Sequence, residues 1–291
     1  MTPYDAMLAP FVEFAFMRRA LVGAVALSLG AAPIGVFLML RRMSLTGDAM
    51  AHAILPGAAV GFLVAGLSLP AMTLGGLVAG VSVALLTGLV ARTTLLKEDA
   101  ALAAFYLLSL ALGVTLVSLK GSNVDLLHVL FGSVLALDDQ ALTLLAGVST
   151  VTLVALALIY RPLVLECVDP GFLASVSRSG GLAHFVFLGL VVLNLVAGFQ
   201  ALGTLLAVGV MMLPAATARF WAASLGGLFA VAIGTAVAAS IAGLLLSYHL
   251  GTPTGPTVIL AAGVFYLASL VFGRHGGALS RLAPPRRHRA A

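Results

Sequence analysis

The stretch AMTLGGLVAGVSVALLTGLV, residues 71–90, contains no charged side chain. A helix rises about 1.5 Å per residue, so a run of this length covers the ~30 Å hydrocarbon core of a bilayer. In lipid the backbone polar groups must pair within the segment, and a helix does this by itself. The stretch therefore predicts a transmembrane helix.

Similar apolar runs recur along all 291 residues, of which 62% are hydrophobic and 9% are charged. Soluble domains carry about a quarter charged residues, so we predict an all-α, polytopic membrane protein. Nine transmembrane helices are expected, at residues 20–40, 51–69, 71–90, 100–119, 141–159, 182–199, 202–218, 222–246 and 258–272. Only a short neutral link separates the sixth from the seventh, so eight is the alternative count.

The predicted organisation has three parts: an N-terminal segment (1–19), a transmembrane domain (20–272) and a basic tail (273–291). The segment FMRRALVGAVALSLGAA, which begins at Phe16, resembles a cleavable signal peptide. Its apolar character continues to Leu40, however, which favours a retained first helix.

The basic loops predict the orientation in the membrane. If the tail is cytoplasmic, counting spans backwards puts the other basic loops on the same side, as the positive-inside rule expects. These loops carry Arg219, Arg161 with Arg178, Arg92 with Lys97, and Arg41 with Arg42. The loop 121–139, with three acidic residues, falls outside, and Arg18 with Arg19 is the exception that the count also leaves outside.

Several function classes are disfavoured by the composition. The net charge of +5 comes largely from the tail, which has no aromatic interleaving, so no nucleic-acid partner is expected. Cys167 is the only cysteine, which excludes a disulfide framework and a thiolate metal cluster. The chain has no G-x-x-x-x-G-K-[ST], H-E-x-x-H or G-x-S-x-G sequence, so a nucleotide cradle and two common hydrolase signatures are missing.

The segment GDAMAHAILPG, residues 47–57, places Asp48 and His52 four positions apart at the start of an apolar run. On a helix such residues share one face, with Cβ atoms about 5–6 Å apart. A carboxylate and an imidazole together suit Zn²⁺, Mn²⁺ or Fe²⁺. The alternative is structural, in which Asp48 caps the helix and His52 donates to a neighbouring carbonyl.

A second pair, Asp125 and His128, lies in the outer loop at i, i+3 spacing. It could form a helix that hands over or gates a metal, but a solvated amphipathic helix on the membrane surface is the favoured interpretation. Four further histidines have no acidic or histidine neighbour at ligand spacing and are interpreted as structural: His184, His249, His275 and His288.

The inner loop RPLVLECVDPGFLASVSRSGG, residues 161–181, contains signals for a short cytoplasmic helix. Asp169 is a favoured N-cap, Pro170 suits the first helical position, and Gly180 can adopt the left-handed conformation that ends a helix. The predicted helix runs from Pro170 to about Ser179.

Four stretches together resemble the integral permeases of metal-ion ABC importers, the zinc/manganese/iron uptake family. They are LRRMSLTGDAMAHAILPG (40–57), VDLLHVLFGSVLAL (124–137), LGTLLAVGVMMLPAATARF (202–220) and GTPTGPTVIL (251–260). The resemblance extends from about Phe16 to Phe272 and covers nearly the whole chain. It implies a homodimeric permease, not an enzyme, in the inner membrane of a bacterium, with an ABC-type ATPase inside and a metal-binding solute-binding protein outside.

The resemblance also implies roles for particular residues. Asp48 and His52 become ligands of the transported ion, Zn²⁺ or Mn²⁺ with Fe²⁺ as a third option, and no cofactor is bound permanently. The loop helix becomes the coupling helix that docks into the ATPase, through Asp169, Pro170, Gly171, Phe172, Leu173, Ala174 and Arg178. The chain departs from the family at two places. Gly171 and Phe172 follow the Asp-Pro where an acidic residue is common, and the glycine usually found later in the helix is replaced around Ser177.

Two other functions were weighed against this one. A proton-coupled secondary transporter of metals or small solutes needs ionisable residues deep in several spans. Seven of the nine predicted spans contain no Asp, Glu or His. A membrane metallohydrolase needs three protein ligands and a general base at one site, whereas the sequence offers one convincing pair.

Overall fold

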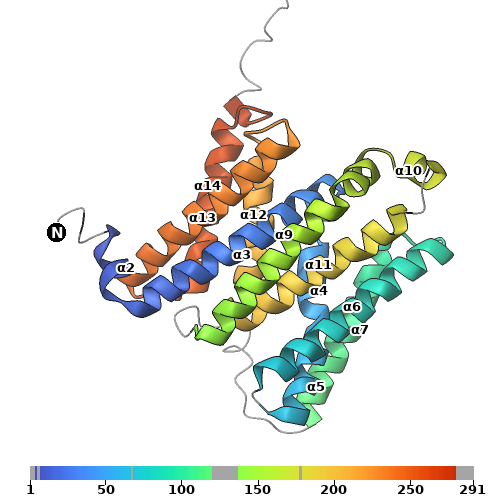
Figure 1. The fold of residues 1–291 in the computed structure, drawn as a ribbon, viewed down its shortest axis with the longest axis horizontal. Coiled ribbons are helices and arrows are strands. Elements are labelled where there is room, and N and C mark those ends of the chain that lie inside the picture. Colours follow the sequence, from blue (N-terminus) through green and yellow to red (C-terminus); the bar gives the residue numbers. More distant parts are fainter. Residues whose placement is uncertain (1–3, 5–6, 67, 120–136, 177–178, 280–291) are drawn as a thin grey trace, which may run out of the picture.

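The computed structural model describes residues 4, 7–66, 68–119, 137–176 and 179–279. Within these residues the chain is helical and contains no strand, which confirms the predicted all-α class (Figure 1). The helices are α2 (Ala9–Glu13), α3 (Ala15–Leu40), α4 (Thr46–Ala53), α5 (Leu55–Ala65), α6 (Leu69–Thr93), α7 (Glu98–Leu119), α9 (Asp139–Val168), α10 (Pro170–Val176), α11 (Ser179–Leu202), α12 (Thr204–Ala218), α13 (Leu225–Leu250) and α14 (Thr254–Phe272).

Eight stretches of the described residues are long and apolar enough to cross a membrane. They correspond to α3, α4 with α5, α6, α7, α9, α11, α13 and α14. α3 and α11 are the most buried of these and form the centre of the bundle. The multi-pass prediction is therefore confirmed.

The predicted seventh span is a short helix, α12, of 15 residues. Such a helix is about 22 Å long, less than the ~30 Å of a hydrocarbon core. It nevertheless returns the chain to the end of the bundle where α3 ends, because Arg219 Nη1 lies 3.5 Å from the carbonyl oxygen of Met39. The nine predicted passes thus become eight full-length stretches and one short helix in the described residues.

The two ends of the bundle sort the loops as the charge pattern predicts. One end is here called the α10 end, after the helix that Figure 1 shows at the upper right. Arg41 and Lys97 lie near each other at this end, Arg41 pairs with Glu166 just before α10, and Arg219 lies beside Met39 at the end of α3. At the opposite end Arg19 pairs with Asp139, with 3.0 Å between Nη2 and Oδ1. Arg19 therefore lies at the same end of the bundle as the start of α9, as the count of spans predicts.

The second membrane stretch is broken at Ile54, between α4 and α5. Pro56 lies in the first turn of α5, where its ring and missing N–H interrupt the hydrogen-bond ladder of a continuous helix. The stretch begins at Thr46, five residues before the predicted start at residue 51. Asp48 and His52 consequently lie inside α4, ahead of the break.

Glycines set the distance between α5 and α6. A Cβ at Gly57 would collide with the carbonyl group of Gly75, and one at Gly61 would collide with that of Ala71. Small residues allow helices to approach closely in membranes, where packing replaces the hydrophobic effect as the main attraction. This contact fixes the lower half of the broken stretch and leaves α4 to be positioned by other helices.

Candidate functional site

Asp48 and His52 lie on one face of α4, as the spacing predicts. His52 Nε2 is 3.8 Å from Asp48 Oδ1, and the side chains are 35% and 68% exposed, respectively. The His52 ring faces Tyr106 of α7, with 6.4 Å between the ring centroids. A carboxylate oxygen and an imidazole nitrogen are therefore presented together, and both are accessible.

The structural alternative for this pair is wrong. Leu45 is the N-cap of α4, no side chain caps this helix, and Asp48 lies within its first turn. Within the described residues, His52 makes no hydrogen bond to a carbonyl oxygen. Neither residue is thus engaged in the local structure to which the alternative assigned it.

The exposure of Asp48 needs an explanation, because a carboxylate facing lipid is costly. It is consistent with a water-filled path or with a second protein surface over this face. The described residues hold no group of three or more His, Cys, Asp and Glu side chains that could bind a metal. The described residues of one chain therefore offer two candidate ligands here, and zinc usually takes four.

Three predicted site residues lie outside the described residues: Asp125, His128 and Arg178. Their proposed roles remain predictions.

The loop helix is present as α10, and its cap is confirmed. Asp169 Oδ1 accepts a hydrogen bond of 2.9 Å from the backbone N–H of Phe172. Pro170 is the first residue of the helix, Leu173 is buried, and Gly171 and Phe172 are exposed. Ala174 lies within the same helix.

The end of this helix differs from the prediction. α10 is described as far as Val176, residues 177–178 lie outside the described residues, and Ser179 and Gly180 belong to α11. A Cβ at Gly180 would be 2.8 Å from Leu173 Cδ2, so this glycine makes room for α10 to pack against α11. It does not serve as a left-handed helix stop.

The preceding helix is also longer than predicted. α9 continues past residue 159 to Val168 and includes Pro162. The expected inner loop 161–181 is consequently helical over most of its described length. α10 is joined directly to α9 at Asp169, whose backbone ends one helix and whose side chain caps the next.

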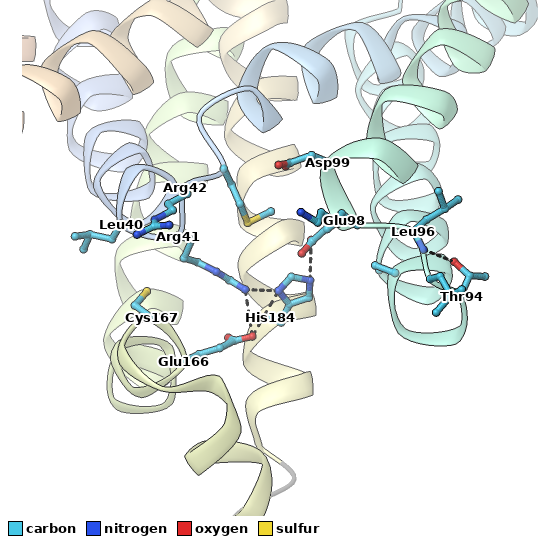
Figure 2. Close-up of a pocket in the computed structure, with 15 residues that line it drawn as sticks. Leu40, Arg41, Arg42, Thr94, Leu96, Glu98, Asp99, Glu166, Cys167 and His184 are labelled. Carbon is cyan, nitrogen blue, oxygen red and sulfur yellow. Dashed lines mark hydrogen bonds and ion pairs between the residues drawn. The ribbon is translucent and has the colours of Figure 1, made fainter.

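A cavity of 1020 Å³ opens at the α10 end (Figure 2). It is lined by the ends of α3, α6, α7, α9 and α11 and by the connection between α6 and α7. Four of its residues form what we call the ionic cluster: Arg41, Glu98, Glu166 and His184. This cluster joins four helices that are distant in the sequence.

The contacts of the ionic cluster are short. Arg41 Nη2 is 3.1 Å from Glu166 Oε1, and the same nitrogen donates to His184 Nδ1. His184 Nε2 is 3.1 Å from Glu98 Oε1. The guanidinium of Arg41 also lies 5.3 Å from the ring centroid of Phe187, within the range of a cation–π contact.

Sequence reasoning missed this cluster. His184 was interpreted as structural because no acidic residue lies near it in sequence, yet Glu98 and Glu166 lie beside it in space. Arg41 and His184 are 143 positions apart. The available signal was topological, since all four residues map to span ends on the same predicted side.

Comparison with known proteins gives consistent matches over nearly the whole chain. Residues 13–273 match the ABC 3 transport family. The manganese import system permease protein ScaB of Streptococcus parasanguinis is 34% identical over 267 residues, which cover 90% of this chain and 94% of ScaB. A probable iron transport system membrane protein of Haemophilus influenzae is 30% identical over 271 residues, 93% of this chain and 98% of that protein.

The fold is also similar to a solved structure. PsaBC from Streptococcus pneumoniae, in complex with a Fab, matches with a TM-score of 0.82 and 29% identity. The match covers 95% of this chain and 98% of the compared chain. The two chains therefore share their fold over 95% of this chain.

Proposed function

This chain belongs to the ABC 3 transport family as a membrane-spanning permease subunit, not an enzyme, and we propose that it carries a divalent transition metal past Asp48 and His52. The observation that carries the proposal is the accessible Asp48–His52 pair, 3.8 Å apart on one face of α4. An ion that binds both groups would offset the cost of placing them in an apolar region.

Manganese is the proposed cargo. Carboxylate oxygen favours Mn²⁺ and imidazole nitrogen suits Zn²⁺ and Fe²⁺, so the ligands alone do not choose. The similarity to a manganese import permease supports Mn²⁺ first, and the similarity to a probable iron transport protein supports Fe²⁺ second. Zn²⁺ is the third competitor in the test below.

A homodimer would complete the site. Asp48 is 68% exposed in a single chain, although it begins an apolar stretch. A second copy facing this surface would remove the carboxylate from lipid and enclose a path between the subunits. Two Asp48–His52 pairs would then supply four ligands, the number that zinc commonly takes, and water could fill further positions.

The partners follow from the two ends of the bundle. The α10 end carries the basic loops, so we assign it, together with the C-terminus, to the cytoplasm and to an ABC-type ATPase. The opposite end would receive the ion from a solute-binding protein. Closure of the ATPase pair on ATP would displace α10 and tilt the helices around Asp48. The proton-coupled alternative is set aside, because the family match extends over residues 13–273.

Metal uptake by the reconstituted complex tests the site. Asp48→Ser and His52→Gln should each abolish uptake of radioactive Mn²⁺, because serine is a poor ligand and glutamine lacks the imidazole. Asp48→Asn should be severely impaired. Unlabelled Mn²⁺, Fe²⁺ and Zn²⁺ are then added as competitors. The degree to which each ion reduces uptake of radioactive Mn²⁺ ranks the three ions as cargo.

Matched controls use the same changes away from the site. Asp139→Asn at the opposite end and His275→Gln beyond α14 replace exposed side chains and should leave uptake near that of the unmodified complex. Full uptake by both Asp48→Ser and His52→Gln, with normal assembly, would show that the pair is not the metal site.

A further inference from the structure

The ionic cluster is separate from the metal site proposed above. Its four residues lie at the ends of four helices. Arg41 directly follows α3, and Glu98 begins α7. Glu166 lies in the last turn of α9, and His184 lies in the second turn of α11. Figure 2 shows their side chains converging on one point of the cavity.

The polar contacts of the cluster form one continuous chain. A guanidinium only donates, so His184 Nδ1 must accept from Arg41. The remaining ring proton is then on Nε2, which lies 3.1 Å from Glu98 Oε1. Glu166, Arg41, His184 and Glu98 are therefore linked in that order, each to the next.

A gain in stability does not by itself account for charged groups buried in this way. The side chains of Arg41, Glu166 and His184 are 9%, 14% and 5% exposed. Removing charges from water costs as much as the pairing returns, and the best-attested use of buried ion pairs is to fix a register or serve in a switch. Among the described residues, Arg41 Nη1 and Glu166 Oε2 have no hydrogen-bond partner, so a second bonding arrangement is open to this pair.

The cluster is attached to α10 on both sides. Glu166 lies three residues before Asp169, which caps α10. His184 lies on α11, the helix after α10. Leu173 of α10 packs against Gly180, which is also on α11. A displacement of α10 would therefore move both partners of Arg41.

Arg41 is attached equally closely to α4. The chain between α3 and α4 is a hydrogen-bonded turn, in which Met43 N–H bonds Leu38 O at 2.9 Å and Thr46 N–H bonds Met43 O at 3.1 Å. Arg42 adopts φ 60° in this turn, the left-handed region that side chains rarely enter. Arg41 is thus held seven positions before Asp48 by a short and constrained connection.

We infer that Arg41 is a positioning residue for transport, which transmits displacement of α10 through Glu166 and His184 to α4 and its Asp48–His52 pair. This inference rests on the proposed function, since it assigns α10 to the ATPase and Asp48 with His52 to the metal. The cluster sets the position of α4 and makes no contact with the ion.

The ratio of metal imported to ATP hydrolysed tests this role in the complete complex in proteoliposomes. Arg41→Gln should retain ATP hydrolysis and Mn²⁺ binding in the absence of ATP, but should import roughly tenfold less Mn²⁺ per ATP, within the usual range of coupling between sites. Arg19→Gln is the matched control, because it breaks an ion pair of 3.0 Å at the opposite end and should leave the ratio unchanged.

Two substitutions of His184 separate the chain of polar contacts from simple packing, and they serve if Arg41→Gln fails to assemble. In His184→Gln the amide oxygen can accept from Arg41 while the amide nitrogen faces Glu98, so the ratio should stay near the unmodified value. His184→Leu keeps much of the volume but breaks the chain, and the ratio should fall.

Three results would overturn the inference: an unmodified ratio in Arg41→Gln, an unmodified ratio in His184→Leu, or an equal loss in both His184 variants. Failure of the unmodified complex to import any of the three metals would count against the proposed function instead. The two failures are therefore distinguishable.

Discussion

The Asp48–His52 pair and the ionic cluster hold ionisable groups in opposite ways. The pair lies on one helix, 3.8 Å apart, with His52 partly exposed and Asp48 exposed, and among the described residues neither side chain has a closer ionic partner. The cluster joins four helices, and its ion pairs of 3.1 Å involve side chains that are mostly buried. The charged groups of the cluster therefore face one another, whereas those of the pair are more open to solvent.

The largest expected difference between the two regions is in stability. Glu166→Ala would leave the guanidinium of Arg41 buried beside an empty position, and breaking one partner of a buried pair costs about 3–5 kcal/mol. Asp48→Ala removes an exposed carboxylate that caps nothing and should change stability by roughly 0.5 kcal/mol or less. Thermal unfolding of the purified protein in detergent measures both, and similar losses would remove the distinction.

The second difference concerns the response to metal. Mn²⁺ that binds the folded protein at about 100 times its Kd should add about 2.7 kcal/mol. The unmodified chain and Arg19→Gln should both show the resulting rise in Tm, while Asp48→Asn should show little of it. A full rise in Asp48→Asn would place the metal elsewhere, with Asp125 and His128 as the next pair to examine.

The smallest expected effect concerns Asp169, an exposed carboxylate that does have a partner in the protein. Because its Oδ1 accepts the Phe172 N–H, Asp169→Ala should cost about 1 kcal/mol, and Asp169→Ser much less, since serine is also a good cap. We expect weaker binding of the ATPase by Asp169→Ala, measured by co-purification, and near-normal binding by Asp169→Ser. Equal binding by all three proteins would show that capping of α10 is not needed for docking.

Local features were predictable from the sequence. Residues 71–90 lie inside α6, because an uncharged run of that length has few alternatives in lipid. The cap at Asp169 was also correct, since its chemistry involves residues three positions apart. The spacing of Asp48 and His52 correctly placed both on one face.

Features that depend on contacts between distant segments were not predictable. Gly180 carries the signal of a helix stop, yet its role is set by Leu173 packing against it. His184 lacks acidic neighbours in sequence and acquires them only when α7 and α9 meet α11. The capping interpretation of Asp48 failed because α4 begins earlier than the apolar run indicates.

The shortness of α12 bears on how the protein responds to lipid. Gly203, with φ 97°, reverses the chain before α12, and its N–H bonds the carbonyls of Gly198 and Phe199 at 3.1 Å. This reversal is buried in protein, which is the setting in which non-helical backbone is tolerated at membrane depth. A thicker or thinner bilayer should therefore tilt the long outer helices while α12, which packs against α3 and α4, keeps its place. The neighbourhood of Asp48 would then be insulated from the lipid composition of the membrane around it.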